Sequence, residues 1–271
     1  MRPFLKPSGI FFLREVEIPV VPAGRMPIVM APMRIAEGLL RRDTRAPLLA
    51  LLLATGVSVA LVGARIWWAG NARYGLLLWN LFLAWLPLVF ALLACRLAAS
   101  RGLRDWRFGA AAAAWLVFFP NAPYIFTDVV HLPLSYWAHY WVDLAVILIC
   151  AVTGLVLGFV SLFLLQSLVT RRWGRTAGWG FVGAVSALSG FGIFLGRFLR
   201  FNSWDVFAKP GRLYQSVSGL AAHPPVEPSL AAFPALFALF VFVSYLLLYG
   251  LTHLHPPSPV AESVDRPPPQ S

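Results

Sequence analysis

The chain has 271 residues, of which 59% are hydrophobic and 12% are charged, and its formal net charge is +11. A soluble domain carries about twice this share of charged residues, so the composition excludes an ordinary soluble protein. Several apolar stretches reach the length of about 20 residues that a helix needs to cross a bilayer. We therefore expect an all-α integral membrane protein.

The basic residues are nearly all arginine and lie beside the apolar stretches. This placement is typical of residues that anchor membrane helices, and it favours contacts with anionic lipid headgroups at the cytoplasmic face. The arginines are not interleaved with aromatic residues on a soluble face, so we expect no nucleic-acid partner. Cys95 and Cys150 fall inside apolar stretches and predict neither a disulfide nor a metal framework. We expect no cofactor, because no nucleotide-binding motif occurs.

Three regions follow from the distribution of apolar residues. Residues 1–46 are rich in Arg and Pro and have no apolar run long enough to span a bilayer, so we expect a disordered cytoplasmic leader. Residues 47–255 form the predicted transmembrane domain. Residues 256–271 are polar and rich in proline, and we expect a disordered tail there.

Within the transmembrane domain we predict six spanning helices, at about residues 47–69, 75–95, 108–126, 142–168, 177–199 and 231–254. The third helix is unusual, because its uninterrupted apolar part ends at Phe119 and two prolines follow at once. We expect a break at Pro120–Pro123. The chain either continues through the prolines and crosses the membrane, or forms a half-span that re-enters.

The positive-inside rule sets the orientation. Sixteen of the 22 Lys and Arg residues lie in the leader, in the loops after the second and fourth spans, and in the tail, against six in the other connections. Both termini are therefore expected in the cytoplasm. With this orientation, residues 120–141 and 197–230 emerge together on the extracytoplasmic side. They hold nearly all the unusual polar residues of the chain.

The first of these stretches follows the predicted break and places Asn121, Tyr124, Asp128 and His131 in an otherwise hydrophobic setting. Irregular polar segments at the edge of a membrane are costly and usually have a function. Asp128 and His131 are three residues apart, so on a helix they share a face. A carboxylate beside a histidine can be a general base pair, half of a metal site or a proton relay. Because they are suited to proton transfer, these two are the candidate catalytic residues.

The second stretch reads Gly-Arg-Phe-Leu-Arg-Phe-Asn-Ser-Trp-Asp over residues 196–205. Arg197 and Arg200 are expected to share a helix face at the outer end of the fifth span. There they can bind an anionic group or neutralise Asp128. The candidate substrate-binding residues are Asn121, Tyr124, Arg197, Arg200, Asn202 and Asp205.

Small and polar residues inside the spans predict helix packing. Gly154 and Gly158 are four residues apart, as are Gly192 and Gly196, and this spacing lets a neighbouring helix approach closely. Asn80 lies between apolar residues of the second span, where we expect an interhelical hydrogen bond.

The polar residues also have a purely structural interpretation. Asp128, paired with one of the two arginines, would lock the third span to the fifth. Asn121 would close the turn between the two prolines. His139 and Asp143 are four residues apart near the water boundary, and we expect an ordinary interfacial face there, not a site.

Two motifs resemble a known family. Pro120-Asn-Ala-Pro-Tyr124 with Thr127-Asp128 and His131, and the stretch from Gly196 to Asp205, are similar to segments of the bacterial membrane family catalogued as domain of unknown function 1361. The resemblance covers about residues 50–255. It implies a multi-pass protein of the bacterial inner membrane and brings no activity, substrate or catalytic residue with it.

Three hypotheses about function are open. The first is an enzyme that acts on a lipid-linked or envelope substrate, in which Asp128, His131, Arg197, Arg200 and Asp205 converge on an open cavity. The second is a transporter or permease, which a broken helix favours but which places its site near the midplane of the membrane. The third is a structural or accessory protein whose polar cluster is fully packed. The oligomeric state is left open.

Overall fold

A computed structural model describes residues 45–70, 74–132, 137–222 and 227–252. The predicted leader, apart from its last two residues, and the predicted tail lie outside the described residues. The described residues form helices and no strand, which confirms the all-α class. In chain order the elements are α2 (Arg45–Ala69), α3 (Gly75–Arg101), α4 (Trp106–Phe118), α5 (Asn121–Tyr124), η3 (Ile125–His131), α6 (Trp137–Trp173), α7 (Arg175–Phe198), α8 (Asp205–Ala208), α9 (Pro210–Ala222) and α10 (Pro228–Thr252).

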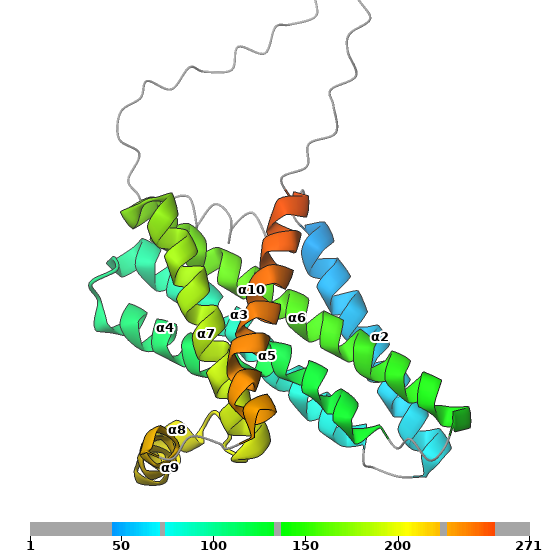
Figure 1. Cartoon of the computed structure of the whole chain (residues 1–271). Helices are drawn as coiled ribbons and strands as arrows, with labels where there is room; N and C mark the ends of the chain where they lie inside the picture. The colour runs from blue at the N-terminus through cyan, green and yellow to red at the C-terminus, as the bar shows by residue number, and fades with distance from the viewer. Residues whose placement is uncertain (1–44, 71–73, 133–136, 223–226, 253–271) are drawn as a thin grey trace, which may run out of the picture.

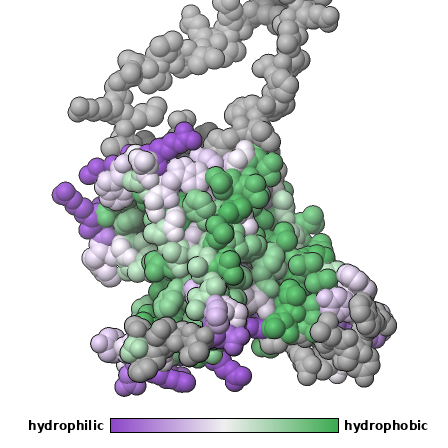
Figure 2. Space-filling model, viewed as in Figure 1, coloured by the Kyte–Doolittle hydropathy of each residue, from purple (hydrophilic) through white to green (hydrophobic). Residues whose placement is uncertain are grey.

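Six segments are long and apolar enough to cross a membrane, which confirms the predicted number of spans. They are Pro47–Trp68, Gly75–Arg101, Trp106–Val130, His139–Trp173, Arg175–Phe198 and Pro228–Thr252. The start of α2 and the end of α10 lie on one side of the molecule, which we call the terminal side, and α8 and α9 lie on the far side (Figure 1). Hydrophobic residues cover the middle of the surface, and hydrophilic residues gather toward the two sides (Figure 2).

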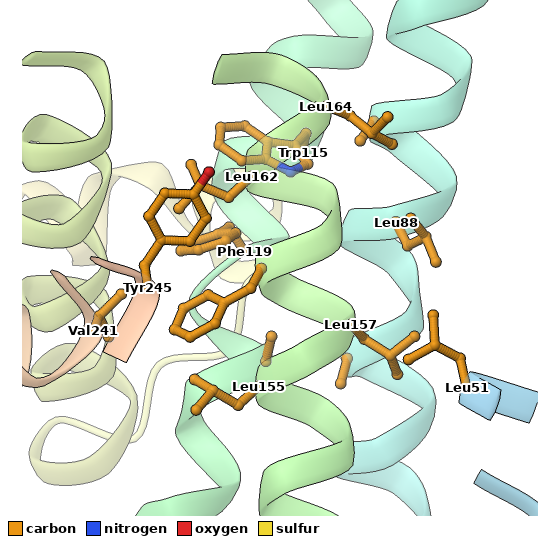
Figure 3. Close-up of a cluster of buried hydrophobic side chains, with 14 of the residues drawn as sticks. Leu51, Leu88, Trp115, Phe119, Leu155, Leu157, Leu162, Leu164, Val241 and Tyr245 are labelled. Carbon is orange, nitrogen blue, oxygen red and sulfur yellow. The ribbon is translucent and has the colours of Figure 1, made fainter. Parts of the chain in front are cut away.

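Helix α6 forms the centre of the bundle. In its most apolar 18-residue stretch, 67% of the residues are buried. The corresponding shares are 17% in α2 and 11% in α10, so these two helices lie at the periphery of the bundle. On one flank of α6, Trp115 and Phe119 lie close to Tyr245 of α10, and on the other flank Leu51 of α2 lies near Leu157 (Figure 3). With 37 residues, α6 is about 55 Å long, which exceeds a hydrocarbon core of about 30 Å. Its oblique course past α7 and α10 accommodates this length (Figure 1).

The third span is broken as the prolines predict. Helix α4 ends at Phe118, and Pro120 and Pro123 lack the backbone N–H that would continue its hydrogen bonds. The backbone nevertheless stays right-handed helical, with φ −58° and ψ −22° at Pro120, and passes through α5 into the 3-10 helix η3. Of the two alternatives for this span, the chain follows the one that continues through the prolines. We call residues 119–131 the broken segment.

Glycines of α6 and α7 let the broken segment lie between these two helices. A Cβ atom at Gly158 of α6 would stand 2.7 Å from the Cβ of Ala122. A Cβ atom at Gly192 of α7 would stand 2.9 Å from Cγ of Pro120. Real Cβ atoms do not approach other atoms this closely, so only glycine fits at both positions without a shift. The predicted close approach along both glycine pairs is confirmed.

Two Gly→Ala substitutions separate this packing constraint from helix propensity. Alanine favours a helix interior by about 1 kcal/mol over glycine, so Gly183→Ala, which meets nothing within 4 Å, is expected to raise the thermal midpoint. Gly158→Ala is expected to lower it, because overpacking costs about 1–3 kcal/mol. The measurement is thermal unfolding of the purified protein in detergent. An equal rise for both variants would contradict the close approach.

Candidate functional site

A cavity of about 1080 Å³ lies beside the broken segment on the far side of the bundle. Its walls come from the start of α3, the broken segment, the end of α7 and the chain from residue 201 to 213. Six of the eight predicted site residues are on these walls: Asn121, Tyr124, Asp128, Arg197, Arg200 and Asn202. The side chain of His131 lies outside the described residues. The two stretches singled out by sequence therefore meet at one cavity.

Asp128 joins three spans through hydrogen bonds and charge. Nη1 of Arg197 in α7 lies 3.5 Å from Oδ1 of Asp128, and Nδ2 of Asn80 in α3 donates to Oδ2 at 2.7 Å. The Arg197 and Asp128 side chains are only 15% and 9% exposed, so the pair is largely shielded from water. The expected contact of Asp128 with an arginine and the expected interhelical hydrogen bond of Asn80 are both confirmed.

Asn121 caps the end of α4 and links it by a hydrogen bond to the chain after α7. Its Nδ2 donates to the carbonyl of Phe118 at 2.9 Å and to Oγ of Ser203 at 2.8 Å. Phe118 ends α4, and the last carbonyls of a helix need partners from outside it. The expected role of Asn121 in closing the turn is confirmed. The bond to Ser203, 82 residues away, was not visible in the sequence.

Arg200 lies beyond the end of α7. The helix ends at Phe198, so the expectation that Arg197 and Arg200 share a helix face is wrong, although both remain on the cavity wall. Arg200 has φ of 55°, a left-handed conformation that costs a residue with a Cβ atom about 1–2 kcal/mol. Its side chain is exposed and makes no hydrogen bond or ion pair with the part of the chain that the structure describes. An arginine in this state is available to an anion from outside the chain.

Asp205 organises the loop after α7 and does not face the cavity. Its Oδ2 accepts the backbone N–H of Asn202 at 2.8 Å, and Oδ1 lies 3.5 Å from Nζ of Lys209. The hydrogen bond from the Asn202 backbone, together with the charge of Lys209, lowers the pKa of the Asp205 carboxyl. The predicted convergence on the cavity is wrong for Asp205, because the side chain turns back onto its own loop.

A second polar cluster contradicts the expectation for Asp143. This residue is 1% exposed, so it does not lie on an exposed face, and its Oδ1 lies 2.5 Å from Nε of Arg65 in α2. The hydroxyl of Tyr74 donates to Oδ2 at 2.6 Å, and burial, followed by this hydrogen bond, raises the pKa of Tyr74. His139 packs edge-on against Trp68, with ring centroids 5.3 Å apart. Sequence spacing missed the cluster because Arg65 and Asp143 are 78 residues apart.

The cavity combines an excess of positive charge with apolar walls. Arg197 and Arg200 bring two positive charges to it and Asp128 one negative charge, while Trp79 and Trp204 contribute aromatic surface. Among the described residues, no group of three or more His, Cys, Asp or Glu side chains could hold a metal ion. The arrangement is suited to binding an anionic group next to hydrocarbon.

The model of a family described as "Protein of unknown function (DUF1361)" matches residues 79–249. The chain belongs to this family. The DUF1361 match contains the broken segment and the end of α7, and so confirms the resemblance seen in those two motifs. Of the second polar cluster, Arg65 and Tyr74 lie before the DUF1361 match. No curated protein and no solved structure matches the chain.

A double-mutant cycle measures the Asp128–Arg197 contact. Asp128→Asn and Arg197→Gln are each expected to lower the free energy of unfolding by about 2–3 kcal/mol, because each leaves a shielded charge without its partner. The double variant is expected to lose at least about 1 kcal/mol less than the sum of the two. The measurement is denaturant unfolding in mixed micelles.

The control for this cycle is Lys209→Gln, which removes the exposed partner of Asp205 and is expected to cost under about 1 kcal/mol. Additive losses for Asp128→Asn and Arg197→Gln would show that the two side chains do not stabilise each other.

Proposed function

We propose that this protein binds a lipid-linked or envelope substrate through an anionic group, in the cavity at the extracytoplasmic face of the bacterial inner membrane. The observation that carries the proposal is Arg200, an exposed arginine in a strained backbone conformation on the wall of a large cavity. Strained residues cluster at ligand-binding sites, where the surrounding structure maintains them. The excess of Lys and Arg on the terminal side supports cytoplasmic termini and an extracytoplasmic cavity.

The roles of the two arginines differ in this proposal. Arg197 is held by Asp128, so it contributes a fixed positive charge to the wall. Arg200 makes the direct contact with the anion, and Asn121 and Ser203 lie on the same wall with hydrogen-bonding side chains. Asp128 acts on the ligand through the position of Arg197. A proton-transfer role for Asp128 and His131 stays a prediction, and binding is the function that the geometry supports best.

The position of the charged residues argues against a carrier. Arg197 lies one residue before the end of the span Arg175–Phe198, and Asp128 lies two residues before the end of the span Trp106–Val130. A carrier site lies near the midplane, about 15 Å deep in a core of about 30 Å. The cavity itself argues against a purely structural role, which predicted a fully packed cluster.

Arg200→Gln tests the proposal with sn-glycerol 3-phosphate as a water-soluble probe. Loss of a charge-assisted hydrogen bond is expected to weaken binding about tenfold or more. The matched control is Arg104→Gln, which alters an exposed arginine between α3 and α4, away from the cavity wall, and is expected to change affinity less than about twofold. The measurement is isothermal titration calorimetry of the purified protein in dodecyl maltoside at low salt.

Arg200→Gly separates binding from folding in the same assay. Glycine adopts a left-handed conformation without strain, so the thermal midpoint is expected to stay level or rise while binding is lost. Binding that survives in both Arg200 variants would exclude Arg200 as the anion contact. A fall in the thermal midpoint of Arg200→Gly would instead assign the side chain a structural role.

A further inference from the structure

The wall that α3 contributes to the cavity is also part of the outer surface of the bundle. Leu76 and Trp79 line the cavity and are 63% and 49% exposed. Both belong to a helix that is long and apolar enough to cross the membrane. A residue that faces the cavity and the surroundings at once marks an edge where the two connect. A side opening of the cavity at these residues would face the bilayer around the bundle.

The opposite edge of this side opening comes from the chain after α7. Trp204, Val206 and Leu213 line the cavity there, and the first two are exposed. The rings of Trp79 and Trp204 meet edge to face with centroids 6.2 Å apart. Tryptophan prefers the boundary between headgroups and hydrocarbon, so this aromatic pair places the side opening at that level of the membrane.

Charged groups and apolar surface both line the cavity. Arg200, Asn202 and Ser203 follow one another around the turn after α7. Leu76, Trp79 and Leu83 line the cavity from α3, and Leu83 is buried. A water-soluble anion would use only the first of these two regions. A molecule that carries both an anionic group and a hydrocarbon chain would use both, and it would enter from the side without leaving the membrane.

We propose that the ligand of the cavity is a lipid phosphate, with its phosphate group at Arg200 and its hydrocarbon chain passing beside the Trp79–Trp204 contact, between α3 and residues 206–213, into the surrounding leaflet. This inference rests on the proposed function, because it assumes that Arg200 binds an anion. Diacyl phospholipids and prenyl phosphates share this chemistry. A cavity of about 1080 Å³ accommodates the phosphate and the adjoining part of the chain.

Three probes test the inference by titration calorimetry on the full chain in dodecyl maltoside: sn-glycerol 3-phosphate, dihexanoyl phosphatidylglycerol and farnesyl phosphate. At least one of the two probes with hydrocarbon is expected to bind about tenfold or more tightly than sn-glycerol 3-phosphate, because its chain buries apolar surface against α3. The tighter of the two identifies the source of the lipid phosphate as diacyl or prenyl.

Trp79→Ala tests the side opening itself. It is expected to strongly reduce the affinity ratio between the tighter hydrocarbon probe and sn-glycerol 3-phosphate, because the hydrocarbon chain packs against Trp79. The matched control is Trp67→Ala, which alters an 87% exposed tryptophan on α2 outside the cavity wall. This variant is expected to bind the hydrocarbon probes more tightly than sn-glycerol 3-phosphate by the same factor as the unaltered protein.

The outcomes separate the two proposals. Equal affinities for all three probes in the unaltered protein would overturn the lipid inference and leave the anion site standing. A ratio of hydrocarbon-probe to sn-glycerol 3-phosphate affinity that stays the same in Trp79→Ala would overturn the side opening. Failure of all three probes to bind the unaltered protein would overturn the proposed function as well.

Discussion

The close approach of the broken segment to α6 and α7 is the constraint on which the rest of the structure depends. Two prolines remove backbone donors inside a membrane-spanning stretch, where unmade hydrogen bonds cost several kcal/mol. Gly158 and Gly192 bring the neighbouring helices close enough to bury the break, and Asn121 supplies a donor to the carbonyl that α4 leaves open. The same segment carries Asp128 to the cavity, so the packing that tolerates the break also builds the site.

The site divides into a fixed part and an open part. Asp128, Asn80 and Arg197 form an interhelical network that ties the broken segment to α3 and α7. Such a network stabilises an arrangement of helices because breaking it leaves shielded polar groups unsatisfied. Arg200, two residues beyond the end of α7, is outside this network. The structural interpretation therefore holds for Arg197, and the proposed binding role belongs to Arg200.

The sequence predicted correctly those features for which a single residue type has a large free-energy cost in the wrong environment. The lengths of the apolar stretches predicted the six spans, and the two prolines predicted the position of the break. The high free energy of an unpaired charge in a membrane predicted a partner for Asp128. Sequence predictions failed where the outcome depends on which helices pack together or on how a loop turns. The end of α7 at Phe198 and the burial of Asp143 against Arg65 have no local signal, because they follow from contacts between residues far apart in the chain.

If the broken segment and the end of α7 enclose a water-accessible cavity on the extracytoplasmic side, a reagent outside the cell will reach a cysteine in the cavity wall. Ser203→Cys supplies this cysteine, because Ser203 lines the cavity and the native Cys95 and Cys150 are buried. The measurement is labelling of this cysteine in intact cells by a membrane-impermeant maleimide. Ser203→Cys is expected to be labelled in intact cells, and the unaltered protein is expected to stay unlabelled. Labelling that requires permeabilised cells, or that fails even then, would contradict this arrangement.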